Sequence, residues 1–378
     1  MAETGLWEFP LKNLFLDPGG RLPVRRNVLM AILLFLLLDL ALYLPLKALA
    51  GAGHVEVFLP LLRILCAIGA GAAAVFHFVT REGHSWKWVF LDAKEGLRSG
   101  WRVMLFFLAY VIAWTFLLLP MGIVALALKA ERPLATMTLE ALAPALAALL
   151  VSLAFLSLEH RSLASIGFRM DRAWTRNLVF GVLFGLLLMG ATAFAIRGLG
   201  GFHWTFNEQG SFVSLALGFL LFLVVAVHEE TVFRGYPFQR LLDSLGPWPT
   251  QILLALVFTI VHWGNPGIRD ASFALKAWTT LNIALAAVLL GLCYLKTRSL
   301  ALPIGVHLGW NWAQGHLLGF QVSGTSGVEG FWKPVLANKP QWLTGGPVGL
   351  EGSALCSVLV LLAILALMLW KPKQPAPA

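Results

Sequence analysis

From about residue 27 onward, long apolar runs alternate with short polar connections along the chain. The run at 103–128 has no charged residue and exceeds the roughly 18–20 residues that a helix needs to cross a hydrocarbon core of about 30 Å. The pattern therefore predicts an all-α fold, a polytopic integral membrane helix bundle. Ten runs are predicted as transmembrane helices, at 27–46, 57–79, 103–128, 141–158, 177–196, 212–233, 250–265, 277–295, 299–319 and 353–370.

The predicted spans and their connections divide the chain into five segments. The connection after the ninth span is long and rich in glycine and proline, and its composition fits a lid as well as a simple loop. The segments are a cytoplasmic lead-in at 1–26, an N-terminal four-helix membrane region at 27–176, a membrane core at 177–320, an extracytoplasmic loop at 321–350, and a last transmembrane helix with a short tail at 351–378.

The composition agrees with a membrane protein. Of 378 residues, 58% are hydrophobic and 12% are charged, whereas a soluble domain has about 45–50% apolar and about 25% charged residues. This excludes a disordered chain and argues strongly against a water-soluble enzyme. Cys66, Cys293 and Cys356 all fall in predicted spans, so the cysteines indicate neither a disulfide framework nor a metal-binding pair.

The net charge of +9 is explained by membrane topology. With the N-terminus in the cytoplasm, nineteen of the 28 Lys and Arg residues fall on the cytoplasmic side and eight on the other, as the positive-inside rule requires. The cytoplasmic residues are spread over six segments, which favours contact with anionic membrane lipids over a nucleic-acid partner. We therefore expect a multi-pass protein of the cell membrane with both termini in the cytoplasm.

Two ionisable residues in the first two spans are expected to pair. Asp39 and Arg63 fall at a similar depth, roughly 18–21 Å from the inner edge of the membrane at 1.5 Å of helical rise per residue. Charged side chains at that depth are costly and usually pair with one another. An ion pair between consecutive helices is therefore predicted.

The second half of the chain carries polar residues in three separate spans at one depth. Glu229 and Glu230 lie in the sixth span, His262 in the seventh, and His307 with Asn311 in the ninth. Counted from the cytoplasmic ends at the helical rise, Glu229, His262, His307 and Asn311 lie about 16, 18, 13 and 19 Å deep. Polar residues at such depth usually mark a functional site. They are expected to surround a polar cavity.

The local spacing predicts different surroundings for the two adjacent glutamates. Glu230 and Arg234 are four residues apart and can form an ion pair on one helical face. Glu229 is rotated by about 100° from its neighbour and is expected to project freely. His307 and Asn311 are also four residues apart and can address a single small volume. The isolated histidines His77, His203 and His316 are interpreted as packing residues that are hydrogen-bonded across helices.

Other hydrolytic motifs fail in this chain. A zinc-binding H-E-x-x-H helix would begin at His228 and Glu229, but Val232 stands where the second histidine belongs. Ser326 lies in a G-x-S-G string, yet that string falls in the glycine-rich loop and is not followed by an apolar helix. No phosphate-binding G-K-[ST] string is present.

The three polar motifs together resemble a known family. The pattern E-E-x-x-x-R at Glu229–Arg234, F-x-x-x-H at Phe258–His262 and H-x-x-x-N at His307–Asn311 is similar to that of the intramembrane CAAX proteases and bacteriocin-processing enzymes. All three motifs are complete and in order, and the resemblance covers about 210–320. It implies membrane helices around a hydrophilic cavity and peptide hydrolysis by an activated water molecule.

The resemblance also implies roles for six residues. Glu229 corresponds to the general base, His262 to the residue that holds and polarises the water, and His307 with Asn311 to the stabilisers of the oxyanion. Glu230 and Arg234 correspond to a supporting pair. The family is also described as metalloproteases, in which case Glu229, His262 and His307 would bind zinc. We favour chemistry that requires no metal cofactor.

Two alternatives to an endopeptidase remain open. A proton-coupled transporter could use intramembrane Glu and His residues as a relay, but no repeat symmetry is detectable. A non-catalytic immunity or scaffold protein could retain the same fold and motifs. For the endopeptidase, the implied substrates are peptides or lipidated peptides, such as prenylated CAAX tails and bacteriocin leaders.

Overall fold

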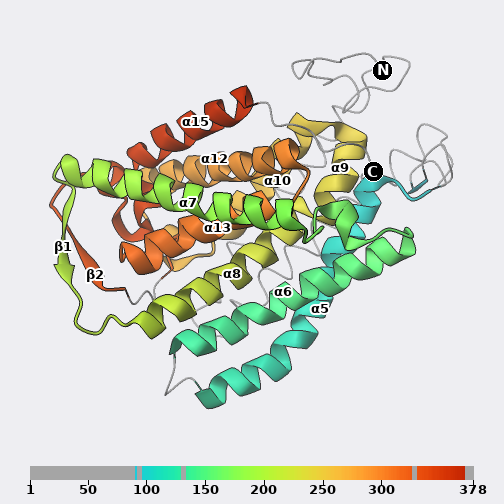
Figure 1. Ribbon diagram of the computed structural model, residues 1–378, viewed down its shortest axis with the longest axis horizontal. Coiled ribbons are helices and arrows are strands. Elements are labelled where there is room, and N and C mark those ends of the chain that lie inside the picture. The colour runs from blue at the N-terminus through green and yellow to red at the C-terminus, as the bar shows by residue number, and fades with distance from the viewer. Residues whose placement is uncertain (1–89, 92–95, 129–132, 326–329, 371–378) are drawn as a thin grey trace, which may run out of the picture. The chain divides into compact units, whose positions relative to one another are not determined.

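A computed structural model describes residues 90–91, 96–128, 133–325 and 330–370 (Figure 1). The chain divides into two compact units, 1–101 and 102–378, and the fold described below is that of the second unit. Several sequence predictions lie outside the described residues: the spans 27–46 and 57–79, the pair Asp39 and Arg63, and the residues His77, Cys66 and Ser326.

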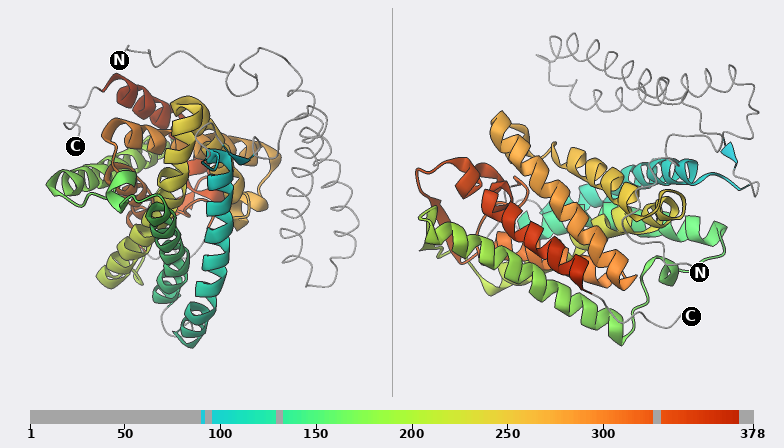
Figure 2. Two further views of the ribbon diagram at one scale, coloured as in Figure 1. Left: turned by 90° about the vertical axis from the view of Figure 1, so that its right-hand side faces the viewer. Right: turned by 90° about the horizontal axis from the view of Figure 1, so that it is seen from above.

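The second unit is dominated by helices. Within it, α12 packs against both α10 and α15, whereas α13 contacts α7, α8 and α12 (Figures 1 and 2). The helices are α5 (Ser99–Leu128), α6 (Pro133–Leu158), α7 (Arg172–Gly198), α8 (Phe212–Arg234), α9 (Tyr236–Leu245), α10 (Pro247–His262), α11 (Pro266–Arg269), α12 (Phe273–Thr297), α13 (Ala301–Trp312), α14 (Gln341–Thr344) and α15 (Ala354–Leu369).

Five helical segments among the described residues are long and apolar enough to cross a membrane. They are Ser99–Leu118, Met137–Leu158, Arg172–Gly198, Phe212–Leu245 and Phe273–Thr297. A membrane helix bundle is therefore supported, but ten spans are not confirmed. The predicted spans 250–265 and 353–370 correspond to α10 and α15, each of 16 residues, and 299–319 corresponds to α13, of 12 residues, with a π-helix at Ala313–Leu317.

The ends of α8 follow from its sequence. Ser211 caps the N-terminus, because its hydroxyl accepts a hydrogen bond from the Ser214 amide. Gly235 ends the helix, and Pro237 in the first turn of α9 starts a new one, since proline tolerates that position. The motif residues Glu229–Arg234 consequently occupy the last turns of α8.

The structure contains a short antiparallel sheet, which the all-α prediction did not include. Strand β1 (Phe202–Phe206), which follows α7, pairs with β2 (Trp332–Leu336) from the predicted loop 321–350. Alternating aromatic residues in β1 suit a strand, but its partner lies about 130 residues away in the sequence. His203, interpreted as a packing residue, is exposed on β1, so that prediction was wrong.

Three polar contacts attach α5 and the end of α6 to α8 and α9. The Tyr110 hydroxyl on α5 is hydrogen-bonded to Nε2 of His228 on α8 at 2.6 Å. Glu159, directly after α6, forms an ion pair with Arg240 of α9 at 3.2 Å and accepts a hydrogen bond from the Tyr236 hydroxyl at 2.6 Å. These contacts fix α8 and α9 against α5 and α6.

Four glycines bring α7 and α13 into backbone contact. A Cβ atom added at Gly305 would lie 2.2 Å from the Leu178 carbonyl oxygen, and one at Gly309 would lie 2.2 Å from that of Val182. Gly181 and Gly185 on α7 meet α13 in the same way. Small residues four apart on both helices are typical of close helix pairs in membranes. This contact fixes the position of α13, which carries His307 and Asn311.

The glycine contact predicts opposite effects of one substitution at two places. Gly309→Ala forces a methyl group against the backbone of α7 and should lower the free energy of unfolding by about 1–3 kcal/mol. Gly190→Ala on α7 is the matched control, because no atom lies within 4 Å of its added Cβ and alanine favours the helix by up to ~1 kcal/mol. Thermal unfolding in detergent measures both, and equal midpoints would contradict the close contact.

Candidate active site

The three motifs meet around one cavity. Glu229 lies in the last turns of α8, His262 is the last residue of α10, and His307 and Asn311 lie one turn apart on α13. All four line a cavity of about 360 Å³. The structure therefore brings together residues that lie up to 82 positions apart in the sequence.

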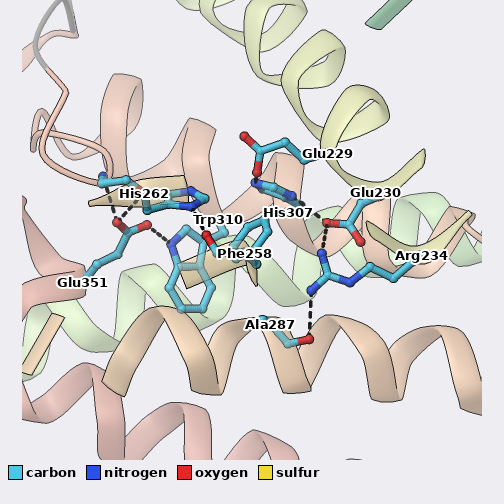
Figure 3. Close-up of polar contacts among 10 residues, drawn as sticks. Glu229, Glu230, Arg234, Phe258, His262, Ala287, His307, Trp310 and Glu351 are labelled. Carbon is cyan, nitrogen blue, oxygen red and sulfur yellow. Dashed lines mark hydrogen bonds and ion pairs between the residues drawn. The ribbon is translucent and has the colours of Figure 1, made fainter. Parts of the chain in front are cut away.

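Glu230 is the most buried charged group of the site. Its side chain is fully buried, and Oε1 accepts hydrogen bonds from Arg234 Nη1 at 3.2 Å and from His307 Nδ1 at 2.8 Å (Figure 3). The ion pair with Arg234 was predicted from the spacing, and the structure contains it. The bond to His307 was not predicted, and it joins α8 directly to α13.

Arg234 is held by more than its carboxylate partner. Its Nη2 donates a hydrogen bond to the Ala287 carbonyl oxygen of α12 at 2.8 Å, and its guanidinium lies 5.1 Å from the centre of the Phe258 ring. A cation over an aromatic face is attracted by the ring electrons. Arg234 thus connects α8 with α10 and α12 behind the cavity.

Glu229 differs from its neighbour as the helical rotation predicts. Its Oε2 lies 3.8 Å from His307 Nε2, beyond hydrogen-bond distance, and has no hydrogen-bond partner in the described part of the chain. The side chain is 20% exposed and lines the cavity. Glu229 is therefore a carboxylate that lines the cavity and whose Oε2, facing His307, is not held by a hydrogen bond from a described residue.

His307 lies between the two carboxylates (Figure 3). Its Nδ1 is the donor to Glu230, because an ionised carboxylate can only accept. A neutral His307 then has a lone pair on Nε2, whereas a protonated one has an N–H there, facing Glu229. In the protonated form, two cations and two anions balance across Glu229, Glu230, Arg234 and His307.

The backbone fixes the tautomer of His262. Its Nδ1 donates to the Phe258 carbonyl oxygen at 2.7 Å, one turn earlier on α10, and the two rings lie 4.4 Å apart. Since a carbonyl oxygen can only accept, the neutral imidazole has its lone pair on Nε2. That nitrogen is left to interact with a molecule in the cavity.

A carboxylate outside the predicted motifs supports the wall next to Asn311. Glu351, 5% exposed, accepts hydrogen bonds from Trp310 Nε1 at 2.6 Å and from the Ser323 amide and hydroxyl at 2.7 and 2.8 Å. Ser323 has a positive φ of 49°, and its carbonyl oxygen accepts from Asn265 Nδ2 at 2.9 Å. Glu351 therefore links α13 with the segment that follows His262. Its signal in the sequence was a lone acidic residue just before the last apolar run.

Two further cavity residues were missed or misinterpreted. Glu140 directly precedes the predicted span 141–158 in the sequence, but the structure has it inside α6 and lining the cavity. His316, interpreted as a hydrogen-bonded packing residue, is 1% exposed and lines the same cavity, and neither ring nitrogen has a partner among the described residues. The interpretation of His316 is corrected accordingly.

The residues suggested for zinc do not form a ligand set. No group of three His, Cys, Asp or Glu side chains within the described ranges is arranged to hold a metal ion. Glu229, His262 and His307 share the cavity, and the hydrogen bonds of Nδ1 leave Nε2 of each histidine available, but the three side chains are not gathered closely enough to hold a metal ion. The arrangement does not fit the tetrahedral zinc sites of proteases, so we derive no step through a metal.

Comparison with known proteins gives a family match for this region. Residues 211–313 match the family described as type II CAAX prenyl endopeptidase Rce1-like. The segment is similar to this family. This confirms the resemblance that the three motifs indicated, and the matched segment contains all six motif residues. Comparisons with curated proteins and with solved structures give no match.

The Rce1-like match and the apolar helices together support a membrane protein with a protease-type domain. The match ends before His316 and begins after Glu140. It therefore includes the motif residues but neither of these two cavity residues, nor Glu351.

The buried ion pair predicts a large loss of stability when its cation is removed. Arg234→Met leaves the charge of Glu230 buried without its guanidinium partner and should lower the free energy of unfolding by about 3–5 kcal/mol. Arg269→Met is the matched control, because Arg269 and Asp270 form an ion pair that is mostly exposed and should contribute about 1 kcal/mol or less. Similar shifts in the thermal midpoint for both variants would contradict the structural role of the pair.

Proposed function

We propose that this protein is an intramembrane endopeptidase that hydrolyses a peptide bond with a water molecule activated by Glu229. The observation that carries the proposal is the Glu229 carboxylate, which lines the same cavity as His262, His307 and Asn311 and whose Oε2 accepts no hydrogen bond from a described residue. The second glutamate is neutralised by Arg234 and is not available for the same task. The Rce1-like match supports a protease-type activity.

Glu229 would act as the general base. A water molecule between Glu229 and His262 would give a proton to the carboxylate as its oxygen attacks the carbonyl carbon of the substrate. The lone pair on His262 Nε2 would orient that water. Glu229 would then pass the proton to the leaving amine, which restores the carboxylate.

His307 and Asn311 would stabilise the negative charge that develops on the carbonyl oxygen. The Asn311 amide has N–H donors, and it lies one turn from His307 on the same helix. Because Nδ1 of His307 is bound to Glu230, Nε2 can donate only when the ring is protonated. The two carboxylates beside His307 would balance the charge of that form.

The walls of the cavity suit a peptide that reaches the site from the membrane. Leu221, Phe222 and Val225 of α8 line it together with the polar residues. We propose peptides or lipidated peptides as substrates, of the CAAX or leader-peptide kind. Membrane lipids would surround the bundle.

The proposal is tested by cleavage with purified protein in detergent. A farnesylated CAAX peptide and a leader peptide are incubated with the wild type and with Glu229→Gln, each with and without a strong chelator. Wild-type cleavage should resist the chelator, and Glu229→Gln should lower kcat by about 10²–10⁴-fold because the base is lost. Glu208→Gln, in the turn after β1, is the matched control and should retain activity. Full activity of Glu229→Gln would rule out the proposed base.

A second variant tests the stabilisation of the oxyanion. Asn311→Leu replaces the amide by an apolar side chain of similar size and so removes the N–H donor. It should lower kcat by about 10²–10³-fold with little change in KM. The measurement is the kinetics of a fluorogenic peptide substrate. Asn338→Leu, at an exposed position, is the control. A change in KM alone would indicate that Asn311 binds the substrate without acting on the transition state.

A further inference from the structure

A second carboxylate besides Glu229 lines the cavity. Glu140 is an exposed residue of α6 within the apolar window Met137–Leu158, and it lines the cavity. It has neither a hydrogen bond nor an ion pair with any described residue. An ionisable side chain in a membrane helix is costly, and by default it indicates a functional role. The proposed mechanism does not use Glu140.

An unpartnered imidazole lines the same cavity. His316 lies on the π-helix Ala313–Leu317, is 1% exposed, and has no hydrogen-bond partner on either nitrogen in the described part of the chain. The ring packs against Gly218, where an added Cβ would lie 2.3 Å from it, and edge-on to Phe222 at 5.5 Å. A buried polar group without a partner carries a desolvation penalty, and π-helices are frequent at functional sites.

The charge of the cavity favours a cationic occupant. Its described lining contains two carboxylates, Glu140 and Glu229, and no lysine or arginine. Because a protonated His307 balances Glu229, Glu140 is the carboxylate of the lining without a compensating charge among the described residues. A carboxylate in a concave site attracts ligands of opposite charge. A neutral imidazole adds a hydrogen-bond acceptor. An anionic group next to Glu140 would meet a carboxylate without a compensating cation among the described lining residues.

We propose that Glu140 and His316 form a subsite for a positively charged group of the substrate, an ammonium or a guanidinium. Glu140 provides the opposite charge and His316 accepts a hydrogen bond. This inference rests on the proposed function, because the ligand is the peptide that is cleaved next to Glu229.

The separation of His316 from His307 places the cationic group of the substrate a few residues from the scissile bond. His316 follows His307 by nine residues, which corresponds to roughly 13 Å along the helix axis. An extended peptide covers about 3.3 Å per residue. The cationic group therefore belongs to a residue up to about four positions from the cleaved bond. It is either the side chain of a lysine or arginine or a free terminal amine.

The subsite is tested with peptides that differ in one group. Peptides with Lys or Gln at each of the four positions on either side of the cleaved bond are compared, with free and acetylated N-termini. In the wild type, one Lys peptide should have a higher kcat/KM than its Gln partner. Glu140→Gln should reduce the ratio of kcat/KM for the Lys peptide to kcat/KM for the Gln peptide by about ten- to a hundredfold. Glu140→Lys should reverse the preference. Glu208→Gln is the control and should preserve it.

His316 is tested by the variant that keeps its shape. His316→Phe retains a flat ring against Gly218 and Phe222 but removes the acceptor, so the Lys preference should fall while the thermal midpoint is retained. If kcat/KM falls when the N-terminus is acetylated and does not differ between the Lys and Gln peptides, the subsite binds the terminal amine. A Lys-to-Gln ratio that is the same in the wild type, Glu140→Gln and Glu140→Lys would overturn the proposal.

A binding measurement separates the subsite from the catalytic proposal. Fluorescence anisotropy of the labelled Lys and Gln peptides is measured on Glu229→Gln, with and without Glu140→Gln. The Lys peptide should bind more tightly than the Gln peptide, and Glu140→Gln should remove this difference. If that is found but the wild type cleaves neither peptide, the result would support the subsite and contradict the proposed function. Cleavage without any dependence on Glu140 in binding or turnover would contradict the subsite alone.

Discussion

The contact on which the site depends is the position of His307 between two adjacent carboxylates. Glu229 and Glu230 are consecutive on α8, and a single imidazole on α13 lies 2.8 Å from one and 3.8 Å from the other. Two buried negative charges at this distance would repel each other strongly in a medium of low dielectric constant. Arg234 on Glu230 and His307 between the two glutamates provide the compensation. The pair can therefore consist of one neutralised and one reactive carboxylate.

This arrangement depends on the position of α13, which is fixed on two sides. On one side, the glycines of α13 lie directly on the backbone of α7, so the separation of the two helices is set by hard contact. On the other side, Glu351 binds Trp310 and Ser323 and holds α13 against the segment after His262. The buried carboxylates thus have two separate tasks: Glu230 and Glu351 position the helices, and Glu229 faces the cavity.

Much of the site could be predicted because helical spacing is local information. The pairing of Glu230 with Arg234 and the different direction of Glu229 follow from 3.6 residues per turn, and a common depth follows from the rise per residue. The contact between Glu230 and His307 could not be predicted. It depends on how α8 and α13 are rotated relative to each other, which is determined by tertiary packing.

The other differences have similar physical causes. Glu140 was missed because a single acidic residue ends an apolar window, although the helix continues through it. β1 and β2 were missed because each strand has five residues and its partner is remote in the sequence. His316 was misinterpreted because sequence alone does not show whether a buried histidine has a partner. Glu351 and Glu140 also lie outside the Rce1-like segment.

The central claim is that polar residues from the three helices α8, α10 and α13 face one water-accessible cavity. Cysteine labelling measures this directly, in a variant whose native cysteines are replaced, because a charged thiol reagent reacts only where the thiolate meets water. Glu229→Cys and Asn311→Cys should react rapidly and be protected by a bound peptide. Leu220→Cys, on the outer surface of α8 and 46% exposed, should stay unlabelled in a lipid bilayer. No labelling at 229 and 311, or labelling equal to that at 220, would contradict the account.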